Sequence, residues 1–195
     1  SAAWLRTAAE LWAQAGEARR AVAAAEPLLS PALYAGRSAD LALWTIAYPR
    51  AFWAELRALA EQHAVDPYLV LAIMREESRF DPEAVSPARA VGLMQLLPST
   101  AAGVLGGRVT PSRLMNPQLN LRAGVAYLGG LLRRSDGSVP LAVAAYNAGP
   151  GGVRRVAALA RTDVDRFVES LPYAETRAYV QRVLQSYGIY RWLYE

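Results

Sequence analysis

Prolines and glycines interrupt this chain repeatedly, and between them the apolar residues recur at helical spacing. The clearest helix start is Asp66-Pro67, because aspartate is a favoured N-cap and proline is favoured at the first helical position. An unbroken apolar run follows as far as Met74, and Asp81-Pro82 then stops the helix. The same signals predict a mainly α-helical fold with very little strand, with helices over residues 1–15, 18–26, 40–47, 50–63, 67–79, 98–105, 118–134, 140–148, 151–160, 163–170 and 174–193.

Pro49 is the predicted boundary between two parts of the chain. Before it, alanine-rich helices are separated by a short turn, and Ser38 is placed to cap the last of them. Short antiparallel helices of this kind are typical of helical-repeat arrays, although a helical extension packed on the main domain fits equally well. We therefore expect a helical segment over residues 1–48 and one larger domain over residues 49–195.

The composition limits the partners of the 195-residue chain. Its formal net charge of +4 and sequence pI of about 9.6 suit a polyanion such as nucleic acid, an anionic glycan or a membrane surface. The arginines that carry the charge are dispersed and no recognition motif accompanies them, so we expect no nucleic-acid binding. No apolar stretch reaches the roughly 18–20 residues that span a bilayer, and no signal peptide is visible. The sequence leaves the oligomeric state open.

Cysteine and histidine usage narrows the possible chemistry. The absence of cysteine excludes disulfides, thiolate catalysis and cysteine metal sites. His63 is the only histidine, so a multi-histidine metal site is excluded and a serine triad would have to use this residue. We therefore expect neither a metal nor a cofactor.

Two adjacent glutamates, Glu76 and Glu77, close the apolar run and are the first candidates for chemistry. At about 100° per residue, Glu77 falls on the helix face of Val70 and Ile73. Glu76 falls on the side of Arg79, so we expect it to be a solvated, ion-paired residue. Apolar neighbours and the negative end of the helix dipole should both raise the pKa of Glu77 toward neutral, as a general acid requires. The alternative is that Glu77 simply reaches solvent at the helix end.

Four blocks then carry a resemblance to a known family. They are "REESRFDPEAVSPARAVGLMQLLPSTA" from Arg75, "LMNPQLNLRAGVAYLGGLL" from Leu114, "AVAAYNAGPGGV" from Ala142 and "ESLPYAETRAYVQRVL" from Glu169. In this order and spacing they resemble the Slt-type lytic transglycosylases, bacterial enzymes that cut the glycan strands of peptidoglycan. The resemblance covers roughly residues 49–193. It implies a lysozyme-like (goose-type) catalytic domain preceded by the end of an α-superhelical domain, located in the periplasm or cell envelope.

The resemblance also implies roles for single residues. Glu77 matches the family's catalytic acid, and the hydroxyl of Tyr146 is expected near it, within reach of a hydrogen bond. The expected substrate-binding residues are Ser78, Ser86, Met94, Gln95, Tyr127, Tyr146, Asn147 and Glu175. From the residues alone, other interpretations stay open, namely core packing for Tyr146 and Met94, a backbone-bonding amide for Gln95, a turn for Ser86 and a helix end for Asn147.

The chemistry implied by the resemblance uses one acid. Ordinary glycosidases use two carboxylates, and the sequence shows no obvious second one beside Glu77. In a lytic transglycosylase, the acid protonates the leaving glycosidic oxygen while the acetamido group of N-acetylmuramic acid assists. The resulting carboxylate then deprotonates the 6-hydroxyl of the same sugar, which closes a 1,6-anhydro ring without using water.

Two alternatives to this function stay open. One is a lysozyme-like hydrolase of the same bond, and the other is a weakly active glycan-binding module. One departure from the family pattern also matters, because Arg89 stands where the family usually has glycine. Arginine there is strained if the position needs a positive φ, and otherwise adds a basic contact at the groove.

Overall fold

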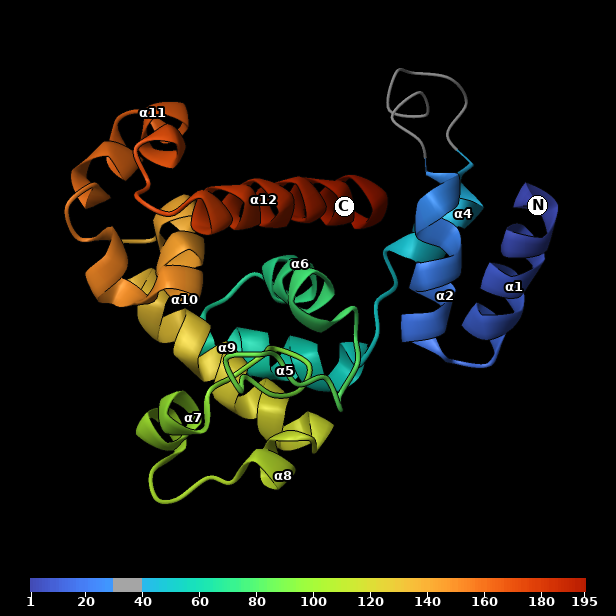
Figure 1. The fold of residues 1–195 in the computed structure, drawn as a ribbon, viewed down its shortest axis with the longest axis horizontal. Coiled ribbons are helices and arrows are strands. Elements are labelled where there is room, and N and C mark those ends of the chain that lie inside the picture. The colour runs from blue at the N-terminus through green and yellow to red at the C-terminus, as the bar shows by residue number, and fades with distance from the viewer. Residues whose placement is uncertain (30–39) are drawn as a thin grey trace.

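The computed structural model describes residues 1–29 and 40–195, and its regular elements are helices (Figure 1). They are α1 (Ala2–Gln14), α2 (Ala18–Ala25), η1 (Glu26–Leu28), α4 (Leu41–Ala47), α5 (Trp53–His63), α6 (Pro67–Ser78), α7 (Pro98–Leu105), α8 (Pro111–Leu114), α9 (Pro117–Arg134), α10 (Val139–Val153), η2 (Ala157–Arg161), α11 (Val164–Glu169) and α12 (Ala174–Tyr194). In the described ranges the only strand-like pairings are two isolated bridges, in which Val91 pairs with Val85 and with Leu96. The predicted mainly α fold with very little strand is confirmed.

Local signals in the sequence explain where several helices begin and end. The Asp66 side chain accepts a hydrogen bond from the backbone N–H of Tyr68 at 2.8 Å and so caps α6. Ser38 lies outside the described residues, and Asp40 is the N-cap of α4. Gly149, at φ 73° and ψ 157°, breaks α10 where the predicted helix ends, and helical turns then resume. The single turn of α8 has no counterpart among the predicted helices, because four residues are too few to show a helical period.

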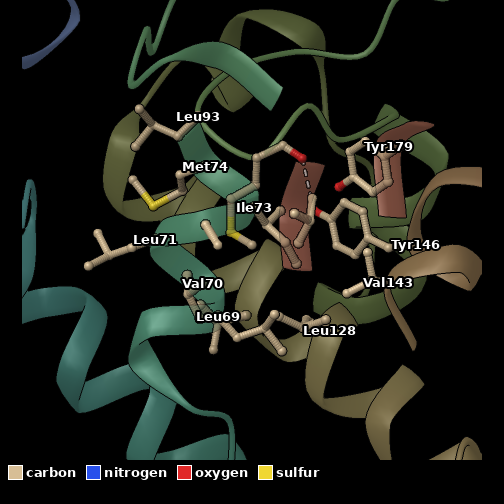
Figure 2. Close-up of a cluster of buried hydrophobic side chains, with 14 of the residues drawn as sticks. Leu69, Val70, Leu71, Ile73, Met74, Leu93, Leu128, Val143, Tyr146 and Tyr179 are labelled. Atoms are coloured by element: carbon tan, nitrogen blue, oxygen red, sulfur yellow. Dashed lines mark hydrogen bonds between the residues drawn. The ribbon is translucent and has the colours of Figure 1, made fainter. Parts of the chain in front are cut away.

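Helix α6 runs through the middle of the larger part of the molecule (Figure 1). Six consecutive side chains, Leu69 to Met74, are fully buried, so apolar contacts surround this stretch instead of covering one face (Figure 2). The long helix α12 and the shorter α5 pack against it. A helix that is apolar all round is stable only when it is enclosed in this way. The enclosure fixes the position of the glutamates at the C-terminal end of α6.

The N-terminal helices α1, α2 and α4 form a separate group at one side of the molecule (Figure 1). Their junction with the rest is polar: Glu26 pairs with the guanidinium of Arg75 at 2.6 Å and with that of Arg79 at 3.0 Å. Arg75 also donates a hydrogen bond to the carbonyl of Ala47 at 3.1 Å. Two elements of the N-terminal part, η1 and the end of α4, therefore contact the C-terminal end of α6.

Aromatic side chains hold the segment between α4 and α5 against the C-terminal helix. The rings of Tyr48 and Tyr190 meet edge to face with centroids 5.3 Å apart, and the hydroxyl of Tyr194 donates to the carbonyl of Tyr48 at 2.8 Å. The hydroxyl of Tyr190 donates to the carbonyl of Pro49 at 3.2 Å. The end of α12 thus fixes the chain at the predicted domain boundary.

Candidate active site

The chain turns sharply immediately after α6. Arg79 and Phe80 have φ values of 49° and 66°, in the left-handed region that residues other than glycine rarely occupy. Phe80 is 3% exposed, so burial of its ring holds the unusual turn in place. Helix α6 consequently ends at Ser78, and Glu77 lies in its last turn.

A cleft of about 760 Å³ opens beside Glu77. Its walls come from the end of α6, the loop that follows, the start of α7, the middle of α9, the second half of α10 and the first turn of α12. Its lining residues are Glu77, Ser86, Pro87, Ala88, Ala90, Gln95, Leu96, Leu97, Thr100, Tyr127, Tyr146, Asn147, Ala148, Gly149 and Glu175. We call this hollow the Glu77 cleft.

Burial raises the pKa of Glu77 to about 7, because few solvent contacts stabilise its carboxylate. A hydrogen bond from the hydroxyl of Tyr179, at 2.7 Å, acts against burial and lowers the pKa. The negative charge of Glu76 raises it, Arg182 lowers it and Glu175 raises it. A carboxyl group with a pKa near 7 can both give and take a proton around neutral pH. The interpretation of Glu77 as a residue that simply reaches solvent is not supported.

Glu76 is ion-paired as expected, but its predicted partner and its predicted solvation are wrong. Its side chain is 10% exposed and pairs with Arg75 at 2.9 Å and with Arg182 at 3.4 Å. The hydroxyl of Ser186 donates to the same carboxylate at 2.6 Å. Arg79 turns instead to Glu26, because α12 covers the helix face on which Glu76 lies.

The tyrosine that contacts Glu77 is Tyr179, and the expected hydrogen bond from Tyr146 is wrong. The hydroxyl of Tyr146 donates to the carbonyl of Met94 at 2.8 Å. Both tyrosines lie at the same edge of the buried cluster, Tyr146 from α10 and Tyr179 from α12 (Figure 2). Tyr179 is part of the "ESLPYAETRAYVQRVL" block, which the sequence analysis connects with the family. Nothing in the block itself distinguishes Tyr179 as the partner of Glu77.

Two of the predicted substrate-binding residues, Ser78 and Met94, do not line the Glu77 cleft. The hydroxyl of Ser78 donates to the carbonyl of Leu93 at 2.8 Å and so joins α6 to the loop before α7. The side chain of Met94 is fully buried, and its sulfur would lie 2.2 Å from a Cβ atom at Gly124. For Met94 the alternative of core packing describes the structure.

Asn120, which sequence reasoning missed, holds the loop that carries Met94. Its side-chain oxygen accepts from the backbone N–H of Met94 at 2.8 Å. Its amide nitrogen donates to the carbonyls of Val91 at 2.8 Å and Leu114 at 2.9 Å. Asn120 is fully buried, so its three hydrogen bonds satisfy backbone groups that water does not reach.

Gln95 and Ser86 both line the cleft and both also support the loop. The amide nitrogen of Gln95 donates to the carbonyls of Ala84 at 3.0 Å and Gly92 at 2.9 Å. The hydroxyl of Ser86 accepts from the backbone N–H of Ala90 at 3.0 Å. Each side chain therefore reaches the cleft already fixed by a backbone contact, and their roles toward a substrate stay predictions.

The other predicted residues of the site also come together at the cleft. The ring of Tyr127 packs against that of Tyr146 with centroids 5.3 Å apart. The side-chain oxygen of Asn147 accepts from the hydroxyl of Thr176 at 2.7 Å, which joins α10 to α12. Glu175, beside Thr176, also lines the cleft. Glu77 and the predicted binding residue Glu175 therefore line one cleft, and the role of Glu175 toward a substrate stays a prediction.

Arg89 adopts a φ of 64°, the value at which arginine is strained and glycine is not. Its backbone N–H donates to the carbonyl of Ser86 at 2.8 Å and closes a turn at the rim of the cleft. The side chain is exposed and does not line the cleft. Of the two interpretations of Arg89, backbone strain therefore applies, and a basic contact at the groove does not.

The described residues, 1–29 and 40–195, also bear on metal binding and on membrane insertion. Within these ranges no group of three or more histidine, cysteine, aspartate or glutamate side chains is arranged to hold a metal ion. No helix in the same ranges is both long and apolar enough to cross a membrane.

Comparisons with known proteins agree with this geometry. The soluble lytic murein transglycosylase of Escherichia coli is 39% identical over 129 residues, which are 63% of this chain and 20% of that protein. A membrane-bound lytic murein transglycosylase C from Cronobacter sakazakii is 33% identical over 163 residues, 70% of this chain and 45% of that protein. The chain thus spans only a fifth to just under half of the length of these relatives.

The fold matches solved structures as well. The 70-kDa soluble lytic transglycosylase of Escherichia coli superposes with a TM-score of 0.85 and 29% identity, covering 98% of this chain and 31% of that one. The lytic transglycosylase Slt of Pseudomonas aeruginosa, solved as an inactive glutamate-to-glutamine mutant, gives 0.76 and 33% identity, covering 95% and 30%. The expected lysozyme-like fold is confirmed by these matches.

A family model supplies the assignment. The model described as the transglycosylase SLT domain matches residues 55–166, which include Glu77 and most of the cleft. The resemblance drawn from the four sequence blocks is therefore confirmed, and the chain belongs to the transglycosylase SLT domain family.

Proposed function

We propose that this chain is a peptidoglycan lytic transglycosylase in which Glu77 acts first as acid and then as base. The observation that carries the proposal is a single carboxyl group with a pKa of about 7 in the wall of a 760 Å³ cleft. A general acid that must next serve as a base works best when its pKa lies near the working pH. The names of the relatives, lytic murein transglycosylases, support the reaction class.

In the proposed reaction, Glu77 protonates the glycosidic oxygen between N-acetylmuramic acid and N-acetylglucosamine. The 2-acetamido oxygen attacks the anomeric carbon and gives an oxazolinium-like intermediate. The Glu77 carboxylate then takes the proton of the sugar's 6-hydroxyl, which attacks the same carbon and forms the 1,6-anhydro ring. Ser86, Gln95 and Asn147 line the cleft and are proposed to orient the acetamido group. The hydrogen bond from Tyr179 holds Glu77 in position through both steps.

Glu175 gives a hydrolase a specific basis as the second candidate function. Its carboxylate lines the same cleft as Glu77 and is in the first turn of α12, where it is exposed to water. Glycosidases that use water position two carboxylates across the scissile bond. One observation weakens this candidate. The N-terminal end of a helix stabilises a carboxylate, so the position of Glu175 in the first turn of α12 is explained without a catalytic role.

The products of digestion separate these functions. Purified peptidoglycan is digested with wild type and with Glu77→Gln, and the soluble products are identified by mass spectrometry. Products ending in 1,6-anhydromuramic acid, absent with the variant, support the transglycosylase. Products heavier by one water with reducing ends would establish the hydrolase instead, and Glu175→Gln would then identify its base. If wild type releases no soluble product, the chain is better explained as a glycan-binding module.

We also propose the domain organisation and location that go with this function. Residues 1–48 would form a helical segment, the end of a longer α-superhelical domain, and residues 49–195 the lysozyme-like catalytic domain. The separation of α1, α2 and α4 from the remaining helices supports this division (Figure 1). The substrate places the protein in the cell envelope, on its periplasmic side. Cell fractionation of the full-length protein tests the location.

A further inference from the structure

A second hollow, of about 410 Å³, adjoins the Glu77 cleft. The two share Thr100 and Tyr127 as lining residues, so an elongated substrate in the cleft can extend directly into the second hollow. Helices α7 and α9 form its sides. Its lining includes Ser99, Thr100, Gly103, Tyr127, Gly130 and Arg134, and we call it the Arg134 hollow.

The hollow is open because both helices carry glycine where they face it. A Cβ atom added at Gly103 would meet nothing within 4 Å, and one at Gly130 would meet only the guanidinium of Arg133, at 3.9 Å. Because no atom would crowd a Cβ at either position, the packing of α7 against α9 does not require glycine there. Glycine inside a helix is also unfavourable relative to alanine, so helix stability does not explain these two residues either. The volume is in the range of small-ligand sites.

The charge of the hollow is opposite to that of the cleft. Glu77 and Glu175 line the cleft, whereas Arg134 is the charged residue that lines the hollow. Within the part of the chain that the structure describes, no carboxylate pairs with Arg134. The planar guanidinium of arginine binds carboxylates through two parallel hydrogen bonds. The hydroxyls of Ser99 and Thr100 supply further hydrogen-bonding groups.

We propose that the Arg134 hollow receives a carboxylate-bearing substituent of the glycan strand whose backbone occupies the Glu77 cleft. The inference rests on the proposed function. The muramic acid residues of such a strand carry a lactyl group, whose carboxylate is free on bare strands and is extended by a stem peptide with its own carboxylates on substituted ones. Arg134 makes the enzyme distinguish the two forms of strand.

The test compares turnover on two substrates made from one preparation. Peptide-bearing glycan strands are used directly, and a second portion is stripped of its stem peptides by an amidase. Wild type, Arg134→Gln and Gly130→Leu are assayed on both, with Arg133→Gln as the control. Arg133 is the neighbouring residue in α9 with the same charge, but it does not line the hollow.

Arg134→Gln should lower kcat/KM roughly threefold to tenfold on one form of strand, as expected for an exposed, charge-assisted contact. A loss confined to peptide-bearing strands assigns the hollow to a stem carboxylate, and a loss confined to stripped strands assigns it to the lactyl carboxylate. Gly130→Leu, which fills the hollow, should give the same selectivity, and Arg133→Gln should give none. The loss should shrink in high salt, because salt screens exposed charges.

Three results would overturn the inference. Equal activity of Arg134→Gln and wild type on both strands would show that Arg134 does not contact a carboxylate of the substrate, while the proposed function would stand. Equal losses on both strands would assign Arg134 to the sugar backbone or the fold, again without touching the proposed function. A wild type that cleaves neither strand would refute the proposed function and the inference with it.

Discussion

The hydroxyl of Tyr179 donates a hydrogen bond of 2.7 Å to the carboxylate of Glu77 across the interface of α6 and α12. This bond stabilises the charged form of Glu77, whereas burial disfavours it. The pKa of about 7 is the balance of these opposed effects, modified by nearby charges. Tyr179 thereby keeps the pKa of Glu77 lower than burial alone would make it.

Tyr179→Phe should raise the pKa of Glu77 above about 7, because it removes a hydrogen bond to the charged form and leaves burial unchanged. The pH profile of kcat/KM on glycan strands should therefore move to higher pH. Tyr187→Phe is the matched control, since Tyr187 is also on α12 but donates to Asp66. Coinciding profiles for wild type and Tyr179→Phe would contradict the role given to this bond.

Glu77 should also make the folded protein less stable as the pH rises. Its folded pKa of about 7 lies above the ordinary value of 4.5, so stability is fully present below about pH 4.5 and is lost as the pH rises to about 7. A shift of this size corresponds to about 3 kcal/mol.

Glu77→Gln should remove this loss. The variant should exceed wild type in free energy of unfolding by about 3 kcal/mol at pH 8 and match it near pH 4. Urea unfolding at the two pH values measures both differences, and Glu55→Gln, an exposed glutamate of α5, is the control. An equal difference between wild type and Glu77→Gln at both pH values would show that ionisation is not the cause.

Features that depend on neighbouring residues could be predicted from the sequence. The start of α6 at Asp66-Pro67 and the interruption of α10 at Gly149 follow from local backbone preferences. The apolar residues beside Glu77 on α6 predict a raised pKa, but burial by the surrounding elements is its main cause. The helix wheel alone therefore leaves a solvent-exposed Glu77 open. Resemblance to the family then supplied the assignment of most cleft residues.

Features that depend on distant contacts could not be predicted. Ser186, which bonds to Glu76, is 110 residues further along the chain, so the helix wheel offered only Arg79 as a partner. Tyr146 and Tyr179 are both buried tyrosines near the same carboxylate, and only the geometry shows which of them reaches it. The buried role of Asn120 depends on the path of the loop before α7, which carries no periodic pattern.

Asn120→Ala should destabilise the protein by about 2–4 kcal/mol, because it leaves the buried N–H of Met94 and the buried carbonyl of Leu114 without partners. The carbonyl of Val91 loses one bond but keeps the one from the backbone N–H of Leu96. The loss should appear in urea unfolding and be accompanied by lower activity, since the loop that carries Gln95 loses its anchor. Asn116→Ala, which removes the N-cap of the same helix, should cost only about 1 kcal/mol. Equal losses for the two variants would contradict the anchoring role.

Arg89→Gly should stabilise the protein by about 0.5–1 kcal/mol, because it relieves a left-handed backbone conformation that costs arginine more than glycine. The gain is partly offset by the greater freedom of glycine in the unfolded chain. Thermal unfolding measures the change. Ala88→Gly, in the same turn but without a positive φ, should lower stability instead. A lower melting temperature for Arg89→Gly would show that the arginine side chain stabilises the turn.

Arg75 and Arg79 share one partner, Glu26, but should differ in their contribution to stability. Arg75 is 8% exposed and also pairs with Glu76, so Arg75→Gln leaves two partly buried carboxylates short of a partner. It should cost about 3–5 kcal/mol. Arg79 is 60% exposed, and Arg79→Gln should cost less than about 1 kcal/mol because water screens its pair. Urea unfolding of both variants measures the contrast, and similar losses would mean that Glu26, not burial of Arg75, determines how firmly the N-terminal helices attach to α6.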